Sequence, residues 1–211
     1  AWSGHPRDGD QVDLKAESTL VHASRIRPCH GERVSGDGVV IRPLDDDGLF
    51  VAIIDVLGHG PEAHELAVAI DAYLDRYRSS DVPGLMTRLH QHLKGTRGAA
   101  VGLCAIDPAA GRADYVSIGN TSLRRFGRLD TRLVSQDGVL GQNMRTPRLQ
   151  SIELEAGDLI VLYTDGVKDR FTSDDYPGVF HHEPGEVART IVERFGKSYD
   201  DAACIAVRYD A

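Results

Sequence analysis

The stretch LFVAIIDVLGHG at residues 49–60 decides how the rest of the chain is interpreted. Its first six residues, 49–54, are all apolar, a run typical of a strand buried on both faces and far too short to span a membrane. Asp55 follows directly, and the turn Gly58-His59-Gly60 comes next. We therefore expect a carboxylate at the end of a rigid strand, beside glycines that let other groups approach the backbone closely.

The elements around this strand predict a layered fold. Val39-Val40-Ile41, followed by the turn DDDG at 45–48, predicts a hairpin with the buried strand. An apolar stripe from Ala63 to Tyr77 predicts a helix, and Asp81 with Pro83 predicts the start of a second. Further strands are expected at residues 12–26, 99–106, 113–118, before Gly127, 159–163 and 203–209, and a third helix at 186–195. Because strands and helices do not alternate, we predict an α/β (α+β) sandwich of two mostly antiparallel sheets flanked by helices.

Length and charge narrow the functional classes. The chain has 211 residues, of which 41% are hydrophobic, and this length fits one domain with a core, which we expect at 11–211. Residues 1–10 are mostly polar, and we expect them to form a flexible N-terminus. Acidic residues outnumber basic ones by 32 to 24, and this net charge of −8 disfavours nucleic acid or an anionic membrane as partner. No signal peptide or membrane-length apolar run is present, and we expect a cytoplasmic location.

The three cysteines are widely spaced and form no C-x-x-C pair, which favours neither a zinc ribbon nor a disulfide framework. Cys104 and Cys204 lie in apolar runs and are predicted to be reduced core residues. Cys29-His30 has no metal-ligating neighbour in the sequence, so we predict a structural role for it.

Several aspartates lie where apolar strands meet polar turns. Asp37 precedes a strand, Asp55 and Asp165 each follow one, and Asp200-Asp201 precede the last strand. Carboxylate oxygens in such positions suit Mg²⁺ or Mn²⁺. Aspartate beside glycine is also the commonest turn chemistry, and each position alone is explained better as a turn, although four such positions together weaken that explanation. Spacing along the chain leaves open whether these side chains converge.

Taken together, the motifs resemble the SpoIIE-like branch of the PPM metal-dependent Ser/Thr protein phosphatases. Residues 55–60 are similar to its D-x-x-G-H-G motif, Gly36-Asp37 to its G-D motif, residues 164–167 to T-D-G-V, and residues 200–202 to its terminal D-D-A motif. The segments 96–100 and 117–120 resemble the RsbX-like members of that branch. The resemblance spans most of the chain and implies the PPM-type fold.

The resemblance also implies a ligand set for two divalent ions, Mn²⁺ or Mg²⁺. Asp55 would bridge both ions, assisted by the backbone carbonyl of Val56. Asp37 would hold one ion, partly through water, and Asp165 and Asp200 would hold the other. Asp200 aligns with the family ligand better than its neighbour Asp201.

Two departures from the family pattern accompany this ligand set. Val40 stands where many members have a second aspartate, and Ala203 stands where threonine is common. Neither change removes an aligned ligand, and we expect both to tune metal affinity rather than to abolish metal binding.

The implied activity is hydrolysis of phosphoserine or phosphothreonine on a STAS-domain, stressosome-type signalling protein by a metal-activated water. His59 would protonate the leaving group or only shape its turn, and Arg33 would bind phosphate or remain solvated. The alternatives are a non-catalytic partner-binding module on the same fold and a metal-dependent hydrolase of nucleotides. The oligomeric state stays open.

Overall fold

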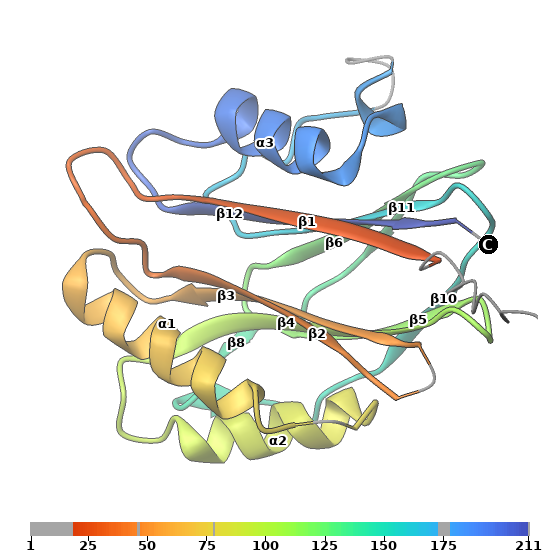
Figure 1. The fold of residues 1–211 in the computed structure, drawn as a ribbon. Helices are drawn as coiled ribbons and strands as arrows, with labels where there is room; N and C mark the ends of the chain where they lie inside the picture. Colours follow the sequence, from red (N-terminus) through yellow and green to blue (C-terminus); the bar gives the residue numbers. More distant parts are fainter. Residues whose placement is uncertain (1–18, 46, 78, 173–177, 211) are drawn as a thin grey trace, which may run out of the picture.

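The computed structural model describes residues 19–45, 47–77, 79–172 and 178–210. Two five-stranded sheets pack face to face, with α1 and α2 outside one sheet and α3 outside the other (Figure 1). The predicted sandwich of antiparallel sheets flanked by helices is therefore confirmed. The predicted flexible segment 1–10 lies outside the described residues, and so does the 12–18 part of the first predicted strand.

Every pairing between neighbouring strands is antiparallel in the described residues. The first sheet has the order β1 (Leu20–Arg27), β12 (Ala202–Tyr209), β11 (Leu159–Tyr163), β6 (Ser122–Phe126) and β7 (Thr131–Leu133). The second has the order β10 (Gln150–Glu153), β5 (Arg112–Ile118), β4 (Ala99–Asp107), β3 (Leu49–Val56) and β2 (Asp37–Pro43). A small ribbon joins β8 (Gly138–Val139) to β9 (Asn143–Met144).

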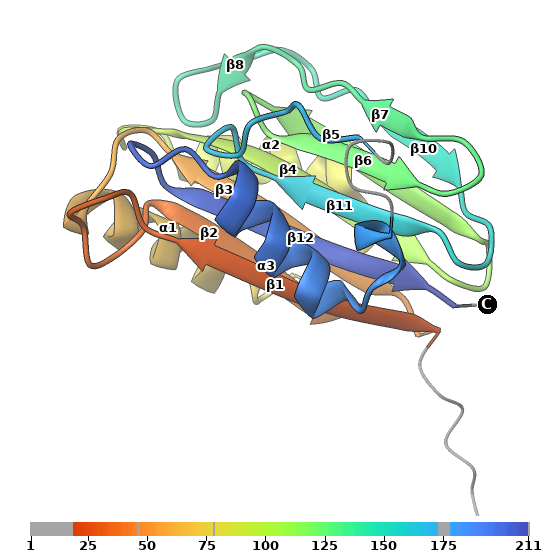
Figure 2. The same ribbon diagram turned by 90° about the horizontal axis from the view of Figure 1, so that it is seen from above.

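The second helix begins directly after its predicted cap, and the first and third begin two residues before their predicted starts. α1 (Pro61–Leu74) starts directly after Gly60, and α2 (Val82–His92) starts after Asp81, whose carboxylate accepts a hydrogen bond from the Gly84 amide at 2.9 Å. α3 (Pro184–Phe195) follows a short 3₁₀ turn, η1 (Val179–His181), and crosses over β1 and β12 in Figure 2. Each α-helix has a proline in its first turn, where the missing amide costs nothing.

Strand β3 explains how the layers hold together. Phe50, Ala52 and Ile54 face the core under α1 and α2, whereas Leu49, Val51 and Ile53 face the core between the two sheets. This alternation is the two-residue period of a strand, applied to a segment buried on both sides. Burial of each large side chain contributes about 1.5–3 kcal/mol. The same alternation directs Asp55 to the face between the sheets.

The structure refines the predicted elements at several places. Strands β7 to β10 were not expected, because runs of two to four residues carry too little periodicity to be recognised. The first helix ends at Leu74 rather than continuing to Tyr77. All three cysteines are buried and free. None of the described helices has the length and apolar character needed to cross a membrane.

Candidate functional site: an acidic centre between the sheet ends

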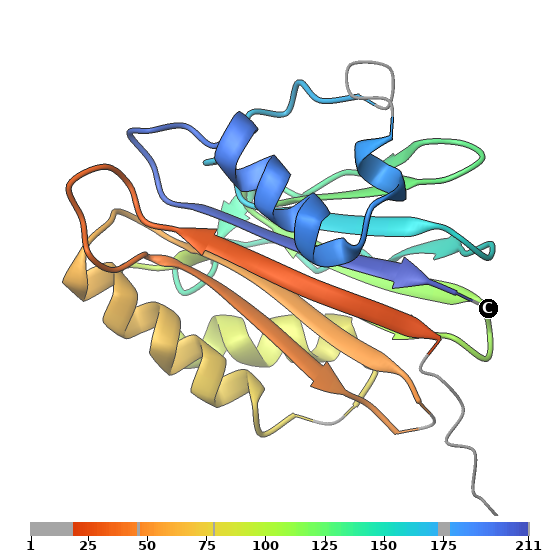
Figure 3. The same ribbon diagram turned by 45° about the horizontal axis from the view of Figure 1, so that its top comes forward.

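The predicted aspartates come from strand ends that meet at one end of the sandwich. Asp37 and Asp55 are paired residues of β2 and β3. Thr164 follows the end of β11, and Asp201 precedes the start of β12, the two strands being antiparallel neighbours in the opposite sheet. In Figure 3 the β1–β2 connection and the loop before β12 lie together at this end.

Two hydrogen bonds join the sheets here. The Thr164 hydroxyl donates to Asp37 Oδ2 at 2.6 Å, and the Gly36 amide donates to Asp201 Oδ2 at 2.7 Å. Gly36 has no space for a side chain, because a Cβ there would lie 2.8 Å from the Cβ of Ala63 and 3.0 Å from the Gly58 carbonyl. The sheets therefore meet through direct contacts beside Asp37.

Burial and neighbouring carboxylates raise the pKa of three aspartates at this end. Burial, followed by the charge of Asp55, raises the pKa of Asp37 well above its usual range, against the hydrogen bond from Thr164. Burial raises the pKa of Asp55 to about 7, and the charges of Asp165 and Asp200 contribute. The pKa of Asp200 is raised in the same direction, first by burial and then by Asp165. An all-oxygen donor set with this much uncompensated charge fits hard divalent cations.

The aspartates are spread around the end of the sandwich. Among the residues that the structure describes, the group that brings three potential ligand atoms within 4.8 Å of one another is Cys29, Glu32 and His59. A pair of hard ions does not require a tighter cluster of carboxylates, because Mg²⁺ retains several waters and takes only one or two carboxylates from the protein.

Asp200 and Asp201 differ sharply in their surroundings. Asp201 is only 4% exposed, and its two oxygens accept backbone hydrogen bonds from Cys29 at 2.8 Å and from Gly36 at 2.7 Å. Asp200 is partly exposed, and the backbone amide of Asp201 donates a hydrogen bond to its carboxylate. The carboxylate of Asp201 thus fastens the loop before β2, whereas that of Asp200 is the more exposed of the two.

Three residues that the sequence analysis gave no role contact the predicted site. Thr164 holds Asp37, as described above. The Asn120 amide donates to Asp165 Oδ2 at 2.7 Å. Arg97 donates to the Leu57 carbonyl at 3.2 Å and forms an ion pair with Glu62. All three residues lie in segments that resemble the SpoIIE-like phosphatases. That resemblance does not indicate which distant side chain each of them contacts.

The turn after Asp55 depends on two glycines for its backbone conformation. Gly58 and Gly60 have φ angles of 86° and 79°, in the left-handed region where other residues are strained. His59 projects between them with its side chain 61% exposed, and its Nδ1 lies 3.0 Å from Glu32 Oε1. The imidazole is therefore accessible to a partner yet fixed on one side by a carboxylate.

Arg33 is exposed on the loop before β2. It lines an open groove of about 420 Å³ together with Glu32, Pro61 and His64. Val40, where the family often has an aspartate, lies in the core under α1 and α2, on the opposite face of β2 from Asp37. Its side chain is therefore part of that core.

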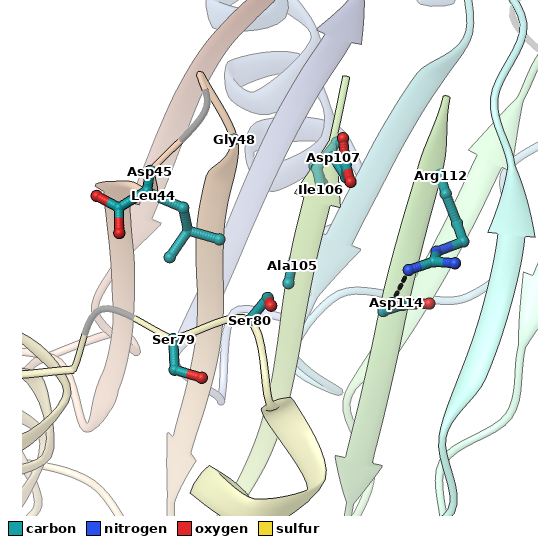
Figure 4. Close-up of a pocket in the computed structure, with 10 residues that line it drawn as sticks. All are labelled: Leu44, Asp45, Gly48, Ser79, Ser80, Ala105, Ile106, Asp107, Arg112 and Asp114. Carbon is teal, nitrogen blue, oxygen red and sulfur yellow. Dashed lines mark ion pairs between the residues drawn. The ribbon is translucent and has the colours of Figure 1, made fainter. Parts of the chain in front are cut away.

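A separate pocket lies at the far end of the second sheet. Figure 4 shows this pocket, of about 340 Å³, between the β2–β3 and β4–β5 turns, with Asp45 and Asp107 on its wall and Arg112 paired to Asp114 at 3.2 Å. β3 runs from this pocket to the acidic centre, so the two are separated by the length of a strand. None of the predicted site residues lines it.

Comparison with known proteins identifies the family. A family model described as Stage II sporulation protein E (SpoIIE) matches residues 45–210, which is most of the chain. The chain belongs to the SpoIIE family. Over 139 residues this SpoIIE-family protein is 27% identical to the phosphoserine phosphatase RsbX of Bacillus subtilis (strain 168), covering 65% of this chain and 69% of RsbX.

Solved structures agree with the fold of this SpoIIE-family protein. A chain from a study of the bacterial stressosome, described as a modular system adapted to control secondary messenger signalling, is 26% identical with a TM-score of 0.82. That match covers 90% of this chain and 99% of the other. RsbX in complex with magnesium is 22% identical with a TM-score of 0.74, over 89% of this chain and 94% of the other. The PPM phosphatase fold is thereby confirmed, and the relationship to RsbX supports protein phosphatase activity.

Proposed function

We propose that the protein removes phosphate from phosphoserine or phosphothreonine of a STAS-domain protein in a stressosome-type assembly, with two divalent ions, Mn²⁺ or Mg²⁺. The observation that carries the proposal is the gathering of Asp37, Asp55, Asp165 and Asp200 at one end of the sandwich, where burial and neighbouring carboxylates raise the pKa of Asp37, Asp55 and Asp200. The similarity to RsbX and to a stressosome chain supports the choice of substrate.

Each aspartate has a proposed position relative to the ions. Asp55, with the Val56 carbonyl, is proposed to bridge both ions, with Asp37 on one of them and Asp165 and Asp200 on the other. When bound, the ions would neutralise charge on the phosphoryl oxygens and lower the pKa of a bound water. Thr164 and Asn120 hold Asp37 and Asp165 in place through their hydrogen bonds. Asp201 fixes the loop that carries Asp37.

The remaining residues act on the phosphate ester. His59 is proposed to protonate the leaving seryl or threonyl oxygen, and Glu32 orients its ring from Nδ1, which leaves Nε2 for the substrate. Arg33 is proposed to bind phosphate from the groove beside this turn. Arg97 stabilises the backbone of the turn through the Leu57 carbonyl.

The decisive experiment is hydrolysis of a phosphorylated STAS-domain protein, a phosphoserine peptide and a nucleotide by the purified chain. We expect activity on the phosphoprotein that requires Mn²⁺ or Mg²⁺, stops with chelator, and is lost in Asp55→Asn. The matched control is Asp45→Asn, the same change at an exposed position near the other end of the β2–β3 pair, which should keep full activity.

The other outcomes separate the alternatives. Hydrolysis of nucleotide but not of phosphoprotein would replace the proposed substrate class. Binding to the STAS-domain protein without any hydrolysis, by folded and metal-loaded protein, would favour the partner-binding module.

A further inference from the structure

A second set of ligand-type side chains lies beside the acidic centre. The Cys29 thiol, a Glu32 carboxylate oxygen and a His59 ring nitrogen all lie within 4.8 Å of one another. Cys29 is buried, Glu32 has a side chain 29% exposed, and His59 is open to solvent. None of the four predicted metal-binding aspartates belongs to this group. Cys29 and His59 lie 30 residues apart along the chain, so their spacing carries no signal of a shared metal site.

The backbone fixes this group from both sides. The Glu32 amide donates to the Cys29 carbonyl at 3.1 Å across a tight turn, with Gly31 at φ 94°, so the two side chains emerge close together. The Cys29 amide is held by Asp201 at 2.8 Å. On the other side, a Cβ at Gly60 would lie only 3.1 Å from Glu32 Oε1, so the turn that carries His59 packs directly on Glu32.

The chemistry of these ligands differs from that of the aspartates. Thiolate and imidazole are ligands for Zn²⁺, whereas Mg²⁺ and Mn²⁺ prefer oxygen. Tetrahedral Zn²⁺ with bonds of about 2.0–2.3 Å places its ligand atoms roughly 3.5 Å apart. His59 Nδ1 and Glu32 Oε1 already lie 3.0 Å apart. Any separation near the 4.8 Å upper limit of this group would need to shorten by about 1 Å on binding. Three protein ligands leave the fourth position for water.

We propose that Cys29, Glu32 and His59 form a Zn²⁺ site that inhibits the enzyme. Zn²⁺ held there ties the loop before β2 to the turn after Asp55 and takes His59 away from the substrate. The inhibitory effect rests on the proposed phosphatase function, whereas Zn²⁺ binding does not. Zn²⁺ binds this site while excess Mg²⁺ occupies the aspartates.

Binding is tested with Co²⁺ as a spectroscopic probe, on the full chain in excess Mg²⁺. We expect one equivalent of Co²⁺ to give the near-ultraviolet charge-transfer absorption of a cobalt–thiolate bond, and Zn²⁺ to remove it. Cys29→Ser should abolish the absorption, and Glu32→Gln should weaken Co²⁺ binding by about 10-fold or more. Cys104→Ala, which removes a buried core thiol instead, should leave the absorption intact.

Cys29→Ser retains the backbone amide that Asp201 holds, and a thermal melt in excess Mg²⁺ checks that this variant folds. Glu32→Gln tests Co²⁺ binding at the same site without changing the thiol. An absorption that persists in Cys29→Ser, or no thiolate absorption in the wild type, would overturn the site.

Inhibition is tested separately by phosphatase assays in excess Mg²⁺ with increasing Zn²⁺. Wild type and Cys104→Ala should lose activity at Zn²⁺ concentrations that leave Cys29→Ser active, and the activity of Cys29→Ser without Zn²⁺ should match wild type. Equal inhibition of wild type and Cys29→Ser would place the Zn²⁺ effect at the aspartates and refute regulation through Cys29. If no variant has phosphatase activity, the proposed function fails, and the cobalt spectra still decide whether the site exists.

Discussion

Replacing Asp55 by asparagine is expected to stabilise the metal-free protein at pH 8. Asp55 is surrounded by the charges of Asp165, Asp200 and Asp201, and burial is the largest cause that raises its pKa to about 7. Without divalent cations its ionised carboxylate is therefore an unfavourable part of the folded state. Asparagine has nearly the same shape and removes the charge.

The magnitude follows from the pKa. The difference between 3.8 and about 7 corresponds to about 4 kcal/mol, at about 1.4 kcal/mol for each factor of ten. Because the pKa of Asp55 is higher in the folded than in the unfolded state, the folded protein binds the proton more tightly. The stability that the protonated Asp55 contributes is therefore fully present below pH 3.8 and is lost as pH rises through about 7. The advantage of Asp55→Asn should be near zero at pH 4 and reach about 2–4 kcal/mol at pH 8.

Urea unfolding in chelator at several pH values measures this difference. The control Asp45→Asn, at an exposed position, should stay within about 0.5 kcal/mol of wild type. Added Mn²⁺ or Mg²⁺ should reverse the order, because ions that bind only the folded state stabilise the wild type more. A metal-free Asp55→Asn protein that is less stable than wild type at pH 8, or a difference independent of pH, would refute the reasoning.

Three further predictions concern the residues around the site. Thr164→Val, which removes the bond to Asp37 and the contact with the Ala203 amide, should lower the free energy of unfolding by about 1–3 kcal/mol in a urea titration. Gly58→Ala, at a φ of 86°, should cost about 1–2 kcal/mol and lower phosphatase activity more than its loss of stability explains. Asp200→Asn should raise the Mn²⁺ concentration needed for half-maximal activity without lowering metal-free stability. Asp201→Asn should instead lower the free energy of unfolding by about 1–3 kcal/mol even in chelator. The reverse pattern would exchange the roles of the two residues.

Much of the fold could be predicted because local signals are strong where burial is strong. The unbroken apolar run of β3, the proline and cap at the start of α2, and the apolar stripe of α1 each match their observed elements. The short strands β7 to β10 were missed because their register is set by neighbouring strands rather than by their own pattern.

The candidate site was predictable only in part. The motifs identify Asp37, Asp55, Asp165 and Asp200 as residues that resemble family ligands, and the structure places their segments at one end of the sandwich. The partners of these residues did not follow from the motifs, because a motif carries no information on which distant side chain will face it.

The sequence by itself determined the layer pattern, the start of α2 and the acidic motifs at strand ends, since each depends on residues close together in the chain. Only the tertiary structure decided that Asp201 holds the loop before β2, that Thr164 reaches Asp37 across 127 residues, and that Cys29, Glu32 and His59 gather beside the turn. The reason is physical: these contacts form where two sheets pack face to face, and their geometry is fixed by the packing of the whole sandwich rather than by local conformational preference.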